Sequence, residues 1–264
     1  MPPDLYFALT LIAKMAITAG FVLVATTTAE RAGPLVAGMV ATLPVGAGPV
    51  YIFLALDHDV QFIAQSAVNS LAINAANALF ALIYALLAQK QTRAVSLGGA
   101  FAVWLISALI IHATPWSFAG AAAMNVVVLG LCQWLARPLR HVRMPPFRAR
   151  WTDLAMRALL VATLVGVVVT FSFRLGATGS GILAVFPVVL LSIILILHNR
   201  VGGKASAAVL ANAPLGLIGF GFACTVLHFT AIPFGSAIGL TLALATSVAW
   251  NMLMLTARRH GLPV

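Results

Sequence analysis

The sequence predicts an all-α integral membrane protein with about nine transmembrane helices arranged as an inverted-topology repeat. Three observations predict this fold class. Of the 264 residues, 62% are hydrophobic and only 8% are charged, whereas soluble domains carry about 25% charged residues. Nine apolar stretches approach or exceed the roughly 20 residues that a helix needs to cross a bilayer core. The two halves of the chain also align with each other, which constrains the whole fold.

The nine predicted helices follow one another with short connections. They comprise residues 5–29, 33–56, 61–88, 95–113, 116–136, 152–173, 177–197, 204–227 and 233–256. Most of their residues are apolar on every face, as expected for helices that contact lipid or the core of a bundle. The first helix starts at once, in "MPPDLYFALTLIAKM", without a basic segment before it. We therefore expect no cleavable signal sequence.

The distribution of basic residues predicts the orientation in the membrane, because Lys and Arg are enriched in cytoplasmic loops. A cytoplasmic C-terminus places twelve of the fifteen Lys and Arg residues on that side, including the loop "RPLRHVRMPPFRARW" (137–151). Arg174 then lies outside, together with Asp4, Asp57 and Asp59. We expect a multi-pass protein of the cell inner membrane with its N-terminus outside. This topology explains the net charge of +10 without nucleic acid as a partner.

An internal duplication relates the two halves of the chain. An offset of 143 residues aligns residues 10–69 with 153–212 without a gap and with fourteen identities. We call two residues separated by this offset mates. The informative mates are Arg31/Arg174, Gly33/Gly176, Gly38/Gly181, Pro44/Pro187 and Asn69/Asn212.

The helix at 116–136 lies between two copies of four helices and determines how the copies are oriented. One extra crossing turns the second copy over relative to the first. The predicted organisation is a four-helix repeat at 1–113, a linker helix with a basic cytoplasmic loop at 114–150, and an inverted four-helix repeat at 151–264. Inverted repeats of this kind are typical of secondary transporters.

The second helix of each copy contains residues that interrupt helices. The two segments read "GPLVAGMVATLPVGAGPV" (33–50) and "GATGSGILAVFPVV" (176–189). Pro44 and Pro187 each remove a backbone donor, and glycines such as Gly46 and Gly48 permit non-helical dihedral angles. Irregular backbone at membrane depth requires protein or a water-filled cavity around it. We expect two broken helices that meet near the midplane; the alternative is that the glycines only allow tight packing.

A short motif in these segments is shared with a known family. It consists of a small residue, Gly, four apolar residues, an aromatic or aliphatic residue and Pro, from Ala37–Gly38 to Leu43–Pro44 and from Ser180–Gly181 to Phe186–Pro187. In this motif each half resembles the small bacterial inner-membrane GlpM-like proteins. The resemblance covers nearly all of the chain apart from the linker helix. It implies a four-helix unit in each half and a chain built of two fused copies.

Two basic residues lie inside predicted helices, where an ionisable side chain is a candidate functional residue. Lys14 lies in the first helix with Thr18 on the same face, and its mate is Arg157. Inverted symmetry would direct both cations toward one central region, where helix N-termini add partial positive charge and favour an anion. The alternatives are a structural role for Lys14 and, for Arg157, snorkelling or a pair with Asp153.

A polar stripe follows the third helix. Ser66, Ser70, Asn74 and Asn77 lie within one arc of a helical wheel, and the mates Asn69 and Asn212 add an amide to each copy. The stripe is compatible with the lining of a polar pathway and with hydrogen bonds to neighbouring helices.

The sequence contains no P-loop, HExxH, GxSxG or Cys/His cluster, so we expect no enzyme, metal site or cofactor. We expect a secondary transporter or permease for a small solute, with anions favoured, whose partners are the lipid bilayer and the solute; a homo-oligomer is also compatible. The alternatives are a non-transporting accessory or scaffold protein of envelope polymer assembly, and a channel or scramblase-like protein. The candidate substrate-binding residues are Lys14, Thr18, Pro44, Gly46, Gly48, Asn69, Asn74, Arg157, Pro187 and Asn212.

Overall fold

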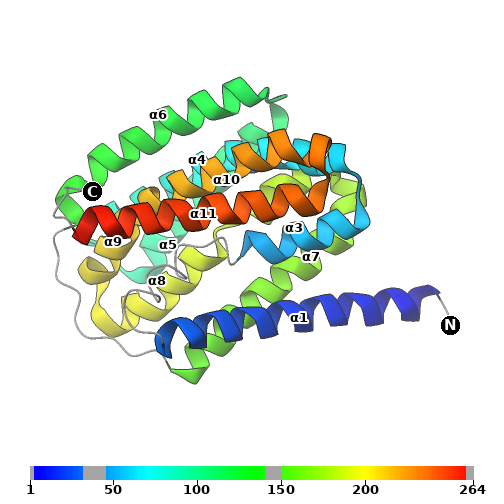
Figure 1. The fold of residues 1–264 in the computed structure, drawn as a ribbon. Coiled ribbons are helices and arrows are strands. Elements are labelled where there is room, and N and C mark those ends of the chain that lie inside the picture. Colours follow the sequence, from blue (N-terminus) through cyan, green and yellow to red (C-terminus); the bar gives the residue numbers. More distant parts are fainter. Residues whose placement is uncertain (1–2, 32–45, 141–149, 260–264) are drawn as a thin grey trace.

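The computed structural model describes residues 3–31, 46–140 and 150–259, and this part of the chain is built of helices without a strand. The predicted all-α class is therefore confirmed (Figure 1). The helices are α1 (Pro3–Arg31), α3 (Ala47–Asp57), α4 (Val60–Leu87), α5 (Arg93–Ala113), α6 (Phe118–Ala136), the short 3-10 helix η1 (Arg137–Leu139), α7 (Trp151–Ala184), α8 (Val188–Val201), α9 (Gly203–Ala211), α10 (Ala213–Phe234) and α11 (Ser236–Arg259).

Seven helical stretches of the described residues are long and apolar enough to cross a membrane. One of them extends over Trp151–Val201, and the shorter apolar helix α3 comes in addition. The peripheral helices also expose large apolar side chains, such as those of Ile12, Leu109 and Val126, as lipid-facing helices do. The chain is a polytopic helical membrane protein by these criteria.

The central helix of the bundle is α4. Asp59 caps its N-terminus by accepting a hydrogen bond from the backbone N–H of Phe62 at 2.8 Å. Small side chains such as those of Ala67, Ala72 and Ala76 are almost fully buried, and they allow α5, α6, α7 and α10 to pack closely around α4.

Helix α7 reverses its direction at Gly176. This residue has φ +62° and ψ −173°, a backbone conformation that glycine adopts without steric cost. Before the reversal, Asp153 contacts Arg200 and Ser172 contacts His58; after it, Ala177 lies against α4. The segments before and after Gly176 thus correspond to the first crossing predicted at 152–173 and to the start of the one predicted at 177–197.

The second of these helices is interrupted as its sequence predicts. The segment after Gly176 ends at Ala184, and α8 begins at Val188 with Pro187 as its N-cap residue. In the first half of the chain α3 begins at Ala47, while the whole segment 33–45, which includes Pro44, lies outside the described residues.

One predicted helix is divided where the sequence analysis expected a continuous one. The stretch predicted at 204–227 breaks at Asn212 into α9 and α10. Pro214 lies in the first turn of α10 and lacks the N–H that would continue the α9 hydrogen bonds. The guanidinium group of Arg140 donates to the carbonyl oxygen of Ala211 at 3.3 Å. A backbone carbonyl group at the interruption therefore has a hydrogen-bond donor from a side chain.

Related helices begin at a constant spacing. Val60 and Gly203 start α4 and α9, and Arg93 and Ser236 start α5 and α11, in both cases 143 residues apart.

The helices α4 and α9–α10 pack antiparallel to each other. The hydroxyl groups of Tyr84 and Ser206 lie 2.9 Å apart near one end. Near the other end, Nδ1 of His228 lies 3.0 Å from the carbonyl oxygen of Ala64. Figure 1 shows the same opposed course for α5 and α11.

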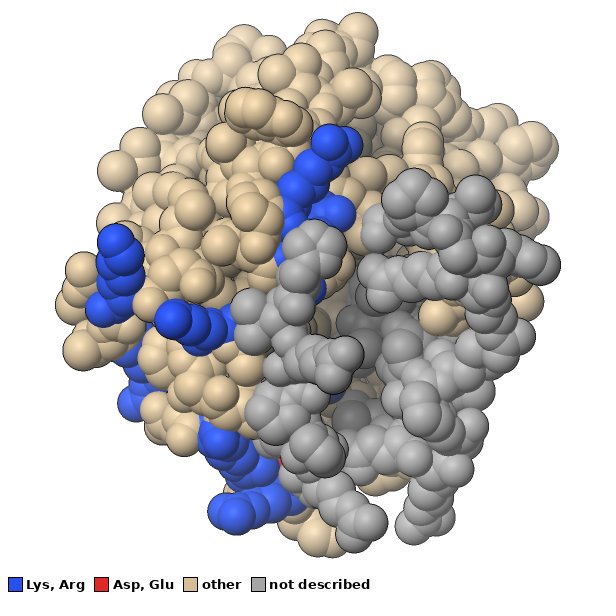
Figure 2. Space-filling view, turned by 90° about the vertical axis from the view of Figure 1, so that its left-hand side faces the viewer, with Lys and Arg blue, Asp and Glu red and all other residues tan. Residues whose placement is uncertain are grey.

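Basic residues gather at one end of the bundle. The α4–α5 link, the end of α6, the α8–α9 link and the C-terminal end of α11 lie there, opposite the start of α1 (Figure 1). Figure 2 shows this face with its Lys and Arg side chains. Basic residues on these links include Lys90, Arg93, Arg137, Arg140, Arg200 and Lys204.

Candidate functional site

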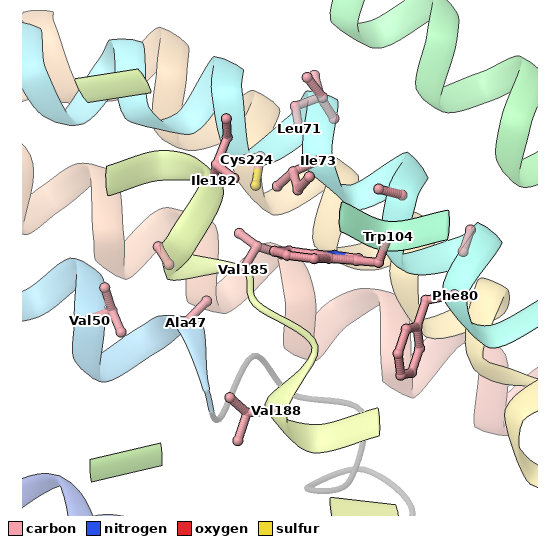
Figure 3. Close-up of a cluster of buried hydrophobic side chains, with 14 of the residues drawn as sticks. Ala47, Val50, Leu71, Ile73, Phe80, Trp104, Ile182, Val185, Val188 and Cys224 are labelled. Atoms are coloured by element: carbon pink, nitrogen blue, oxygen red, sulfur yellow. The ribbon is translucent and has the colours of Figure 1, made fainter. Parts of the chain in front are cut away.

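The two half-helices α3 and α8 start beside each other. A Cβ atom placed on Gly46, the N-cap residue of α3, would lie 3.7 Å from Cγ2 of Val189 in α8. Figure 3 shows Ala47 next to the link that joins Val185 to Val188. We call Gly46, Ala47 and the segment 185–189 the half-helix junction.

Both half-helices present their N-terminal ends to the half-helix junction. Neither Gly46 nor Pro187, the two N-cap residues, forms a side-chain cap hydrogen bond. The first N–H groups of a helix have no partner within the helix, and the helix dipole adds partial positive charge at the same place. The junction therefore presents two positive helix ends to one region, which favours an anionic group.

Side chains of α4 hold the backbone of the interrupted helix. Ser66 donates to the carbonyl oxygen of Ala177 at 3.1 Å, and Asn77 donates to that of Val185 at 2.8 Å. Ser70 donates to the carbonyl oxygen of Gly181 at 2.7 Å. Of the two roles predicted for the polar stripe, hydrogen bonding to neighbouring helices is the one found at these residues.

Two aromatic residues that the sequence analysis did not select complete this network. Tyr51 in α3 lies 2.6 Å from the Ser70 hydroxyl, and it is the donor because Ser70 already donates to Gly181. Trp104 in α5 donates its indole N–H to Oδ1 of Asn77 at 2.7 Å. A buried indole or phenol group requires such a partner, and this requirement is the signal that could have identified both residues.

The ring of Phe186 closes the half-helix junction on the side of α5. Its centroid lies 5.0 Å from the ring of Trp104 and 5.9 Å from that of Phe101. The described break is thus surrounded by protein, with hydrogen bonds to its backbone and aromatic packing around its side chain.

Asn74 joins α4 to α10 and α6. Its Nδ2 donates to the carbonyl oxygen of its mate Leu217 at 2.8 Å and lies 3.3 Å from Oδ1 of Asn125 in α6. Asn125 in turn donates to the carbonyl oxygen of Leu71 at 2.5 Å. The linker helix is therefore fastened to α4 by an amide that the sequence analysis did not select.

Lys14 is not an isolated cation. Its Nζ lies 2.6 and 2.8 Å from the two carboxylate oxygens of Asp57, the last residue of α3. Phe53 lies below the ammonium group, with 5.6 Å between Nζ and the ring centroid. The neighbouring Thr18 donates to the carbonyl oxygen of Lys14 within its own helix. The alternative of a structural role for Lys14 is thus supported by a specific partner, Asp57, which lies 43 residues away along the chain.

The expectation that Lys14 and Arg157 share one central region is wrong. Arg157 is half-buried one turn after Asp153, whose carboxylate oxygens accept two hydrogen bonds of 2.7 Å from the Arg200 guanidinium group. Asp57 ends α3 and Arg200 lies near the end of α8, and these two helices run in opposite directions (Figure 1). The two ion pairs lie toward opposite ends of the bundle because the half-helices diverge from their junction.

The mates Asn69 and Asn212 form the same local hydrogen bond. Asn69 donates to the carbonyl oxygen of Gln65 at 2.9 Å, and Asn212 donates to that of Ala208 at 2.8 Å. Each amide therefore donates a hydrogen bond to the backbone of the preceding helical turn.

Asn69 also lines a pocket of about 610 Å³ at the end of the bundle opposite the basic face. Thr178 contributes to the same pocket from the segment that follows Gly176. Its other lining residues are Gln65 and the α5–α6 link from His112 to Ser117. The pocket thus reaches from the bundle end to the interrupted helix.

The remaining candidate residues have separate positions. Gly48 lies in the first turn of α3, with open space where a Cβ atom would be. Pro44 is outside the described residues. Among the residues that the structure describes, no group of three His, Cys, Asp or Glu side chains is placed to hold a metal ion.

Comparison of the chain with protein-family models, with curated proteins and with solved structures finds no significant match. The resemblance of each half to the GlpM-like proteins therefore stays a prediction from the sequence.

Proposed function

We propose that this protein is a secondary transporter with inverted repeats that moves a small solute through the half-helix junction. In this proposal residues 1–113 and 151–264 are the two copies, and residues 114–150 provide the linker helix and a cytoplasmic loop. The chain crosses a bacterial inner membrane nine times, with the N-terminus outside and the basic face in the cytoplasm. Transporters of this architecture bind their solute at the repeat interface, between discontinuous helices.

One observation carries the proposal: residues of the two copies that are mates contact each other. Gly46 lies against its mate Val189, and Asn74 donates to its mate Leu217. A residue that contacts its own mate lies on the axis that relates two copies, so these contacts support a two-fold axis through the half-helix junction and the α4–α10 interface. The antiparallel course of α4 and α10 is what such an axis requires.

The half-helix junction favours an anionic solute. Two helix N-termini without a side-chain cap face it, and the positive ends of their helix dipoles attract negative charge. Gly46, Gly48 and Pro187 shape the backbone there. Lys14 is bound in its ion pair with Asp57 at the far end of α3, so neither Lys14 nor Arg157 is part of the proposed solute site.

Uptake into proteoliposomes tests the proposal. The purified protein is reconstituted and presented with radiolabelled panels of small anions, zwitterions and neutral solutes. We expect saturable uptake of at least one anion by the wild type and its loss in Gly46→Leu, because the added side chain meets Val189. Gly130→Leu on α6 is the matched control, since open space surrounds its Cβ position. Equal uptake by both variants would remove the junction from the pathway.

A second candidate function is that of a non-transporting accessory protein of envelope polymer assembly. The observation that favours it is the packing of the described break, where the carbonyl oxygen of Val185 and the ring of Phe186 are both enclosed by protein. Absence of uptake for every class of solute, with a folded protein in the membrane, would favour this function over transport.

A further inference from the structure

The far ends of the two half-helices each carry a histidine and a charged side chain. The helix α3 leads into Asp57 and His58, and α8 contains His198 and Arg200 in its last turn. Asp57 and Arg200 are mates of opposite charge. Each end therefore has one charged residue and one histidine, although the two segments differ in sequence.

At the end of α3, both side chains bind neighbouring helices. Asp57 forms the ion pair with Lys14 of α1, at 2.6 and 2.8 Å. Nε2 of His58 lies 2.8 Å from the hydroxyl oxygen of Ser172 in α7. The imidazole ring also stacks on Phe62, with centroids 3.7 Å apart and planes 5° from parallel. We call the Lys14–Asp57 and His58–Ser172 contacts the α3 latch.

The end of α8 is bound in the same manner. Arg200 forms two hydrogen bonds of 2.7 Å with Asp153, which lies one turn before the mate of Lys14. Nδ1 of His198 lies 2.7 Å from the hydroxyl oxygen of Tyr84 in α4. We call the Asp153–Arg200 and Tyr84–His198 contacts the α8 latch. Each latch thus joins the far end of a half-helix to the first helix of its own copy and to one further helix.

Three of the four charged side chains in the two latches keep partial contact with solvent, and Asp153 is buried. The Lys14 and Asp57 side chains are 16% and 24% exposed, and those of Arg200 and Asp153 are 24% and 9% exposed. Ion pairs that keep part of their hydration separate at far lower cost than fully buried charges. Each half-helix has one end at the junction and the other at its latch, so the latch contacts hold its far end against the neighbouring helices.

We infer that the α3 latch and the α8 latch are alternating gates, which open the half-helix junction to the outer and the cytoplasmic side in turn. This inference rests on the proposed function, because gates that open in turn are useful to a transporter. Both latches are closed in the structure, so it corresponds to an occluded arrangement. An inverted repeat can exchange the conformations of its two copies. This exchange produces two related states that differ in which latch is closed.

A cysteine reporter tests the latches without a solute. Val189→Cys places a thiol at the junction in a chain whose two native cysteines, Cys132 and Cys224, are replaced by alanine. A membrane-impermeant maleimide is applied to one side of oriented vesicles at a time. We expect Asp57→Asn to raise the labelling rate from the side of the α1 start, and Arg200→Gln from the basic side, each by about tenfold for a shift of one decade in the open population.

Two further variants separate gating from damage to the fold. The double exchange Lys14→Asp with Asp57→Lys restores an ion pair of reversed polarity and should return labelling to the wild-type rate. Lys90→Gln removes a charge from the basic face without touching either latch and should leave labelling unchanged. The inference is overturned if neither latch variant changes the rate, or if both raise it from the same side.

The experiment also distinguishes this inference from the proposed function. Labelling that depends on the side in the two latch variants, without uptake of any solute, supports the gates and rejects transport. Saturable uptake together with wild-type labelling in Asp57→Asn and Arg200→Gln supports transport and rejects the latches as its gates.

Discussion

Asn77 illustrates how a single polar side chain acts inside this bundle. Its Nδ2 donates to the carbonyl oxygen of Val185, and its Oδ1 accepts the indole N–H of Trp104. Both partners are buried, and the carbonyl group has lost the helical hydrogen bond that an uninterrupted chain would provide. One amide thus replaces the missing bond at the break and orients the aromatic ring that packs on Phe186.

Replacement of Asn77 by alanine should therefore be costly. We expect Asn77→Ala to lower the free energy of unfolding by about 1–2 kcal/mol, because it leaves a buried carbonyl oxygen and a buried N–H unsatisfied. Asn69→Ala is the matched control, since that amide bonds to its own helix, and should cost below about 0.6 kcal/mol. Unfolding in detergent micelles measures both, and an equal loss would contradict the role assigned to Asn77.

Gly181 allows α4 and the interrupted helix to approach each other. A Cβ atom at this position would collide with the carbonyl oxygen of Ser66. We expect Gly181→Ala to destabilise the protein by about 1–3 kcal/mol through this overlap. Gly98→Ala in α5, where no atom lies within 4 Å of the new Cβ, should be neutral or stabilise by up to about 1 kcal/mol. Melting temperatures of the two variants that shift in the same direction would contradict this prediction.

At the scale of single elements, mates in sequence do not always give the same local structure. Helix α4 runs through Leu71 without interruption, whereas its mate in the second copy is Pro214, and the helix there divides into α9 and α10. The ends of α3 and α8 differ in charge, since the mates Asp57 and Arg200 have opposite signs. Both residues nevertheless form an ion pair. Equivalent elements keep their position while the chemistry of their contacts changes.

The link between α3 and α4 should respond to pH through His58. Burial lowers the pKa of His58 below its usual value of 6.5, and Lys14 lowers it further, while the carboxylates of Asp57 and Asp59 raise it in part. Because the folded protein binds the proton less well than the unfolded chain, this contribution to stability is complete above pH 6.5. It is lost as the pH falls from that value through the lower pKa of the folded state.

Thermal unfolding between about pH 8 and about pH 5 measures this effect. We expect the wild type to lose more stability on acidification than His58→Gln, whose amide can still reach Ser172 but does not titrate. The opposite order, or identical profiles, would show that another group controls acid stability in this link.

At the scale of the whole molecule, the antiparallel course of α4 and α10 determines which links share an end of the bundle. The links after α4 and after α8 meet at the basic end of the bundle (Figure 1), where a Cβ atom on Gly203 would collide with the carbonyl oxygen of Ala88. The link between α5 and α6 lies at the opposite end. An arrangement with two parallel copies would instead separate the links at Lys90 and Lys204.

Labelling of single cysteines in intact cells tests this arrangement. We expect Lys90→Cys and Lys204→Cys to be protected from an impermeant thiol reagent and to react only after the membrane is made permeable. Thr114→Cys, in the exposed α5–α6 link, should react in intact cells. Reaction of the first two cysteines from different sides would exclude inverted copies, and with them the proposed pathway.

Much of the fold could be predicted because its signals are local. Long apolar runs predict helices, and the reversal at Gly176 and the interruption at Pro187 occur where residues with special backbone requirements stand. The polar stripe of α4 was also recognisable, but its role was not. A helical wheel shows that Ser66, Ser70 and Asn77 share a face and does not show what lies opposite.

The sequence by itself determined the helical class, the position of the interrupted helix and the 143-residue spacing of corresponding helix starts, since each depends on neighbouring residues or on comparison within the chain. Only the tertiary structure decided which polar groups meet. Lys14 finds Asp57 across 43 residues, and Asn77 finds Val185 across 108. Such contacts depend on the rotation and height of each packed helix, which are set by the side chains of several helices together.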